Sequence, residues 1–254
     1  MSDIVTLAPR VPLSEPIEVD GLTADRVASL SEKQIAELPA WHGRRAVQLG
    51  DFFSVRGGNA AVVRIEGDVS LLRGLAVAMT GGEIVVEGQV GDDVACGMSG
   101  GVLRIGGNAG DRLGAAAPGA SIGMTGGEII VGGSTGSEAG ARMRRGLIVV
   151  GGSAGAHAGR AMIAGSLVVL GTTGARPGRF NKRGTIVAAG PIDVPISYRY
   201  ACTYRPPHVR LTMTYLRRRH HVAIDERVAG GCYRRYCGDA GEPGKGEILE
   251  WIAE

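Results

Sequence analysis

Histidine is the side chain of this sequence best suited to proton transfer and metal binding near neutral pH. The five histidines are His42, His157, His208, His220 and His221. None belongs to an HExxH pair, whose spacing places two ligands on one face of a helix. If the adjacent pair His220–His221 lies in an extended segment, the two rings point to opposite faces. The histidines therefore predict neither a metal site nor a catalytic base.

Cysteine is the second candidate for nucleophilic or metal chemistry. The four cysteines are Cys96, Cys202, Cys232 and Cys237. They have neither CxxC spacing nor the density of a disulfide framework, which favours ordinary reduced thiols. A cluster or metal bound by Cys232 and Cys237 is the alternative.

Two glycine-rich patterns resemble catalytic motifs. Ser99 stands in the stretch Met98 to Gly101, and the string Gly107-x-x-Gly110-x-x-x-Gly114 resembles a phosphate-binding loop. Both patterns recur along the chain, and no Lys-Ser/Thr pair follows the glycines, so they are turns. We expect no catalytic residue and no metal ligand on this chain, and the sequence identifies no cofactor-binding residue.

The elements that carry these residues repeat with a fixed period. Methionine recurs every nineteen residues, except across one insertion of seven, at Met79, Met98, Met124, Met143 and Met162. A unit of this length is too short to bury a core alone and must stack on its neighbours. The middle of the chain is therefore predicted to be a solenoid.

Apolar residues inside each repeat pair at i and i+2, which is the period of a strand. The first position is held by Ile84, Leu103, Ile129, Ile148, Leu167 and Ile186, and the second by Val86, Ile105, Val131, Val150, Val169 and Ala188. Columns of glycine mark the turns of every coil. We predict an all-β fold, a single-stranded right-handed β-helix of about 19-residue coils with non-repetitive caps at both ends. Ile129 and Val131 should point inward, and Glu128 outward, where substitution should be mild.

The methionine column has two interpretations. Thioethers fill irregular gaps in a core, so a column of them at one coil position indicates packing. Thioethers also bind soft metal ions such as copper. A column that follows the whole length of a rod does not converge on one point, which favours packing.

Composition divides the chain into three segments. Residues 1–56 are predicted to form an N-terminal cap with a short helix, Glu32–Leu38, begun by a capping box of Ser31 and Gln34 and ended by Pro39. Residues 57–190 are the coils, and residues 191–254 form a C-terminal cap or docking segment. The insertion at 115–123 is expected to bulge from the flank of the rod.

The chain has neither an apolar stretch of about 18 residues nor a charged and then apolar leader, so a cytoplasmic location is expected. The C-terminal segment contains every tyrosine and many of the arginines of the chain. Both residue types are enriched at interfaces, so this segment is either a docking surface or a solvated basic cap. A net charge of +3 is too small for a dedicated nucleic-acid binder.

The repeated glycine coils resemble a domain shared by the large chain of glutamate synthase and the C subunit of formylmethanofuran dehydrogenase. The flanking motifs are similar to those of the dehydrogenase protein. They are Trp41–Gly43, Leu49–Phe53, Cys202–Pro206, Tyr236–Asp239 and Gly244–Leu249. The resemblance covers nearly the whole chain.

This resemblance implies a non-catalytic structural subunit of a multi-subunit enzyme. One relative is the bacterial formyltransferase/hydrolase complex, which passes a formyl group from tetrahydromethanopterin to a methanofuran-type carrier and releases formate. The other is the tungsten or molybdenum formylmethanofuran dehydrogenase of methanogens. Lysine is rare, found only at Lys33, Lys182 and Lys245, and the excess of arginine favours a GC-rich bacterial genome.

The implied partners are a molybdopterin-enzyme-like subunit, an amidohydrolase-like subunit that holds the metal, and a formyltransferase subunit. No cofactor is expected on this chain itself. Two other classes stay open, a homo-oligomeric scaffold and an acyltransferase of the hexapeptide β-helix type. The period of nineteen is not a multiple of six, and only His157 would be available as the catalytic histidine, so the acyltransferase fits less well.

Overall fold

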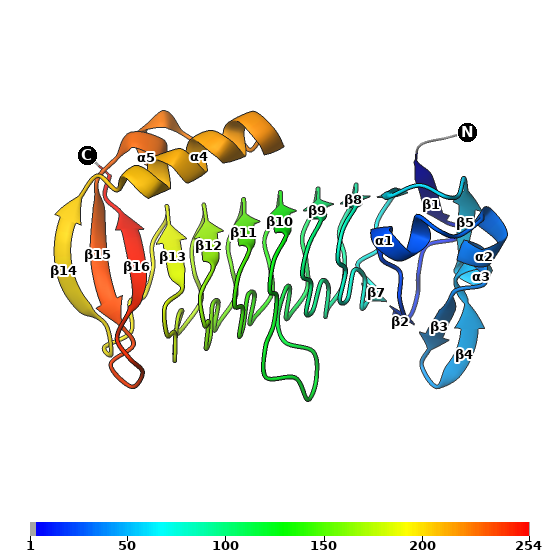
Figure 1. Cartoon of the computed structure of the whole chain (residues 1–254), viewed down its shortest axis with the longest axis horizontal. Coiled ribbons are helices and arrows are strands. Elements are labelled where there is room, and N and C mark those ends of the chain that lie inside the picture. The colour runs from blue at the N-terminus through cyan, green and yellow to red at the C-terminus, as the bar shows by residue number, and fades with distance from the viewer. Residues whose placement is uncertain (1–3, 254) are drawn as a thin grey trace.

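The computed structural model describes residues 4–253, and within them the strands form two sheets. The larger has twelve strands in the order β14-β15-β16-β13-β12-β11-β10-β9-β8-β6-β1-β5 (Figure 1). The smaller has four, in the order β4-β3-β2-β7. The fold is mostly β, as predicted. The large sheet is open and mixed, whereas the prediction contained only stacked parallel strands between separate caps.

The repeats supply the parallel centre of the large sheet. Its strands are β6 (Val62–Ile65), β8 (Glu83–Val86), β9 (Val102–Ile105), β10 (Glu128–Val131), β11 (Leu147–Val150), β12 (Ser166–Val169) and β13 (Thr185–Ala188). Equivalent positions lie side by side, so that Ile129 pairs with Leu103 on one side and Ile148 on the other. The nineteen-residue period therefore sets the register of the sheet.

Two further contacts join each repeat to the next. A row of isolated parallel bridges runs from Val69 through Val90, Ala109, Thr135 and Ala154 to Thr173. On another side, backbone amides of one turn donate to carbonyls of the preceding turn, as Gly114 N does to Val94 O at 2.8 Å. Neighbouring repeats are thus hydrogen-bonded at the strand and at the turns.

The core lies between these contacts. All five repeat methionines are 0% exposed, which confirms the interpretation of the column as packing. Ile129 and Val131 are also buried, as predicted. The position that follows Met162 by nineteen residues is Asn181, whose buried amide bonds both Gly184 N and Gly184 O.

The N-terminal segment is more structured than the predicted cap. Its strands are β1 (Val5–Pro9), β2 (Ile17–Val19), β3 (Pro39–His42), β4 (Arg45–Gln48) and β5 (Phe53–Arg56), with β7 (Leu72–Arg73) added to the small sheet. Its helices are α1 (Ala24–Val27), α2 (Glu32–Ala36) and α3 (Leu49–Phe52). The capping box of Ser31 and Gln34 is confirmed, but α2 ends at Ala36 rather than Leu38, and Pro39 begins a strand.

The C-terminal segment continues the large sheet with β14 (Arg199–Tyr204), β15 (Tyr233–Gly238) and β16 (Gly246–Trp251). Strand β16 pairs in parallel with β13, and the other two are antiparallel. Two helices, α4 (Pro207–His220) and α5 (Glu226–Gly230), follow β14. The insertion before β10 projects from the row of strands, as predicted (Figure 1).

Candidate interaction surface

Helix α4 covers the outward face of the large sheet. The third residue of each repeat strand points away from the core, and in the covered strands it is apolar and buried. These residues are Ile130, Val149, Val168 and Val187, and Leu249 of β16, which pairs with Val187, continues the row. They pack against Val209, Met213 and Leu216 of α4 in a second apolar core. Figure 1 shows α4 and α5 on one side of the strands between β16 and β10.

The sequence of α4 explains where the helix begins and which face it buries. Pro206 and Pro207 stand at its N-cap and first turn, where a missing N–H costs nothing. Val209, Met213, Leu216 and His220 follow at spacings of four, three and four residues and are all buried. His221 closes the helix in the left-handed conformation, with φ of 55°.

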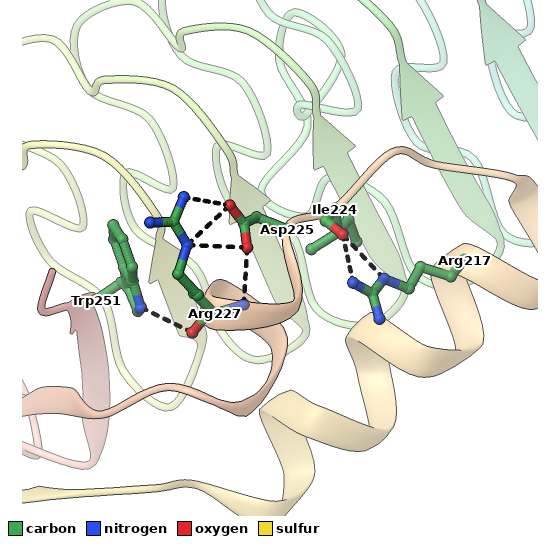
Figure 2. Close-up of polar contacts among 5 residues, drawn as sticks. All are labelled: Arg217, Ile224, Asp225, Arg227 and Trp251. Atoms are coloured by element: carbon green, nitrogen blue, oxygen red, sulfur yellow. Dashed lines mark hydrogen bonds and ion pairs between the residues drawn. The ribbon is translucent and has the colours of Figure 1, made fainter. Parts of the chain in front are cut away.

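Polar contacts fix α4 to the segment that precedes α5, and α5 to β16 (Figure 2). Arg217 Nε donates to Ile224 O at 3.0 Å. The indole N–H of Trp251 donates to Arg227 O at 3.1 Å. Side-chain and backbone hydrogen bonds from Arg227 lower the pKa of Asp225, the N-cap of α5, to about 2. The two helices therefore form one unit with the end of the sheet.

The C-terminal end of α4 is held by Glu128 of β10. The hydroxyl of Tyr215 donates to Glu128 Oε1 at 2.7 Å. His220 Nε2 lies 2.8 Å from Glu128 Oε2, an ion-pair distance without the alignment of a hydrogen bond. The His220 side chain is 0% exposed. Burial lowers its pKa from 6.5, because desolvation outweighs the attraction of Glu128.

This geometry corrects two expectations. His220 and His221 do not lie in an extended segment, since one ends the helix and the other caps it. Glu128 does point outward, but it is contacted by Tyr215 and His220, so its replacement is not expected to be mild.

Beyond the end of α4, the outward face is hollowed. A groove of about 540 Å³ is lined by Val85 and Arg104 of the sheet, by His220, and by the segment that follows the helix. Arg104 donates to Glu83 at 2.7 Å, so its charge is paired within the sheet. A smaller hollow of about 300 Å³ lies beside Arg227 and Trp251.

The solvent side of α4 carries apolar and cationic residues together. Leu211 is 71% exposed, and Tyr215, one turn further, is 42% exposed. Arg210, Arg218 and Arg219 are exposed around them. The helix has no acidic residue, and within residues 4–253 these arginines have no carboxylate at ion-pair distance.

The tyrosines of the C-terminal segment serve different purposes. Tyr198 and Tyr233 are buried, and their hydroxyls donate to Gly178 O at 2.8 Å and to Val228 O at 2.7 Å. Tyr200, which is 59% exposed on edge strand β14, and Tyr215 are the exposed ones. Tyr198 and Tyr233 therefore pack within the protein, as expected of a cap, whereas docking through the exposed tyrosines stays a prediction.

The other candidate side chains are scattered. Burial raises the pKa of Cys96 to about 12, and its Sγ donates to Arg112 O at 3.4 Å. His42 lies 2.9 Å from Glu15, and His208 lies 3.8 Å from Glu247. In the described part of the chain, no three His, Cys, Asp or Glu side chains are arranged to hold a metal ion. Nor does any described helix have the length and apolar character needed to cross a membrane.

Comparison with known proteins gives two kinds of match, although no family model matches the chain. The C subunit of the molybdenum-containing formylmethanofuran dehydrogenase 1 from Methanosarcina barkeri is 33% identical over 92 residues, which is 34% of this chain and 31% of that relative. The C subunit of the tungsten-containing formylmethanofuran dehydrogenase 2 from Methanothermobacter wolfeii is 35% identical over 102 residues, 38% of this chain and 37% of the relative. These alignments thus span about a third of each curated relative.

The structural match is longer. A chain in the crystal structure of the formyltransferase/hydrolase complex (FhcABCD) from Methylorubrum extorquens, in complex with methylofuran, superimposes with a TM-score of 0.82. Sequence identity is 32%, and the match covers 98% of this chain and all of that chain. With end-to-end coverage at this identity, and with dehydrogenase C subunits among its relatives, this chain belongs to the family of formylmethanofuran dehydrogenase C subunits.

Proposed function

We propose that this chain is the structural C subunit of a formyltransferase/hydrolase complex. Such a complex moves a formyl group from formyl-tetrahydromethanopterin through a methanofuran-type carrier to formate. The observation that carries the proposal is the match over 98% of this chain and 100% of a chain from the Methylorubrum extorquens complex, whose structure contains methylofuran.

We propose that residues 57–190 form a single-stranded right-handed β-helix, between an N-terminal cap at 1–56 and a C-terminal cap and docking segment at 191–254. The in-register parallel strands and the isolated bridges support stacked coils. Stacked coils make a stiff rod, because each repeat is hydrogen-bonded to the next at its strand and at its turns. A rod of this kind spaces and supports other subunits.

A structural role agrees with how the charged residues of the coils are used. Arg64 donates to Glu87 at 2.7 Å, Arg104 to Glu83 at 2.7 Å, and Arg160 to Glu138 at 2.9 Å. Each pair joins two repeats, so these charges brace the rod. In this proposal the complex is cytoplasmic, and its other subunits hold the catalytic metal and the site for the formyl carrier. Those subunits are an amidohydrolase-like subunit, a formyltransferase subunit and a molybdopterin-enzyme-like subunit.

The second candidate is the C subunit of a tungsten or molybdenum formylmethanofuran dehydrogenase. The curated relatives favour it, because they are subunits of metal-containing dehydrogenases. The two candidates share the structural role and differ in the metal chemistry of the partner protein.

Affinity capture of the tagged chain from its own cells, followed by mass spectrometry, tests the proposal. Formyltransferase and amidohydrolase-like chains should co-purify in fixed stoichiometry. Elemental analysis of the same material separates the candidates, since tungsten or molybdenum equimolar with the complex identifies the dehydrogenase. Capture of this chain alone refutes both.

A further inference from the structure

The outward side of α4 differs from an ordinary solvated helix face. Single exposed apolar residues are normal on protein surfaces. Here Leu211 and Tyr215 are one turn apart and form an apolar strip in the middle of the face, with arginines around it. An apolar centre with arginine at its edge is the usual composition of a protein interface.

Folding of the helix accounts for the hydroxyl of Tyr215, which donates to Glu128, but not for the exposure of Leu211. Val209, Met213, Leu216 and His220 already anchor α4 to the sheet, and Leu211 takes no part in the apolar clusters of the described residues. Arg218 and Arg219 are in the last turn, where positive charge is favourable, but Arg210 is near the N-terminal end, where it opposes the helix dipole. Within residues 4–253 none of these three arginines has a carboxylate at ion-pair distance, so their charge is available to a negatively charged partner.

We propose that Leu211, Tyr215, Arg210, Arg218 and Arg219 form a docking surface for another subunit, which presents an apolar hollow rimmed by Asp and Glu. The inference rests on the proposed function, which supplies the partner, and adds the element that binds it. Charge complementarity selects this occupant. In a second copy of α4 the same arginines would face like charges, because the helix has no carboxylate. An anionic membrane is less suitable, since one leucine and one tyrosine that is 42% exposed offer little apolar area.

The test compares matched substitutions in the tagged full-length chain. Leu211→Asp places a charge in the apolar centre, and Val11→Asp, at a position that is 63% exposed in the N-terminal segment, is its control. Arg210→Glu with Arg218→Glu reverses the charge of the rim, and Arg44→Glu with Arg45→Glu is the control at exposed positions in the turn before β4 and at the start of β4. All of these arginines are exposed, and circular dichroism checks that each variant is folded.

We expect both α4 variants to lose the partner subunits at least tenfold, the loss that follows replacement of an interface hot spot, while both controls retain them. High salt should weaken the wild-type contact, and a photo-reactive residue at position 211 should cross-link to an acidic segment of one identified partner. If the α4 variants co-purify fully with the partner subunits, α4 is not the docking surface, and the proposed function is unaffected.

Two further outcomes also overturn the proposal and can be told apart. If the wild-type chain captures no partner subunit, the proposed function fails together with the surface. If wild type binds phosphatidylserine vesicles and Leu211→Asp does not, the surface serves a membrane instead of a protein.

Discussion

Two glycines at the same position of different repeats test whether the coils stack as described. Gly81 and Gly126 each follow a repeat methionine by two residues, and neither requires a positive φ. A Cβ added at Gly126 would lie 2.2 Å from Ser99 O, a backbone atom of the neighbouring repeat. A Cβ at Gly81 meets no atom within 4 Å. The same substitution therefore has opposite consequences at the two sites.

Gly126→Ala has to push two hydrogen-bonded turns apart, and we expect it to destabilise the protein by about 1–3 kcal/mol, the usual cost of overpacking. Gly81→Ala should be neutral or stabilise by about 0.4–1 kcal/mol, because alanine restricts the unfolded chain. Thermal and urea denaturation of the two variants beside wild type measure both effects. Equal shifts for both variants would refute the stacking of Gly126 on Ser99.

Two more predictions concern α4. Met213→Ala should destabilise the protein by about 2–5 kcal/mol, because Met213 is 0% exposed. Leu211→Ala, at a position that is 71% exposed, should change the stability by no more than about 0.5 kcal/mol. Denaturation and amide exchange of α4 measure both effects, and similar losses of stability would place Leu211 in the core. Because burial lowers the folded pKa of His220 below 6.5, the unfolded state takes up the proton first as the pH falls, and stability should drop as the pH falls through and below about 6.5. His220→Gln should reduce that loss of stability, whereas the exposed control His221→Gln should leave it unchanged. If His220→Gln has the same pH dependence as wild type, the loss does not come from His220.

The repeat was predictable because its signals are periodic. The methionine column and the i, i+2 pairs such as Ile129 and Val131 reflect local geometry that recurs in every repeat. A single position that departs from the pattern therefore does not change the prediction. The short helix after Ser31 was found for a similar reason, since its capping box is a local hydrogen-bond pattern. Its end was misplaced by two residues because the end depends on packing against β5 and α3.

Helix α4 was missed although the sequence contains a sign of it. The strands β10 to β13 read EIIV, LIVV, SLVV and TIVA, so their outward third residue is apolar, whereas β6 and β9 have Arg64 and Arg104 there. An apolar outward column over four neighbouring strands indicates a covering element. The spacing of Val209, Met213, Leu216 and His220 then identifies the helix that covers it.

The contacts of His220, Tyr215 and Glu128 could not be predicted in this way. Glu128 and Tyr215 are 87 residues apart in sequence, and their meeting depends on how far α4 reaches across the sheet. No local pattern encodes that reach. The same holds for the continuation of the sheet by β14 to β16, which only tertiary pairing with β13 defines.

Formate release is the measurement that tests the central claim most directly. Material captured from the source cells through a tag on this chain is compared with the isolated chain, using a formylated furan carrier as substrate. We predict that the captured hetero-oligomer releases formate and that the isolated chain does not. Formate release by the isolated chain, or capture of an inactive homo-oligomer, would contradict a structural subunit of a formyltransferase/hydrolase complex.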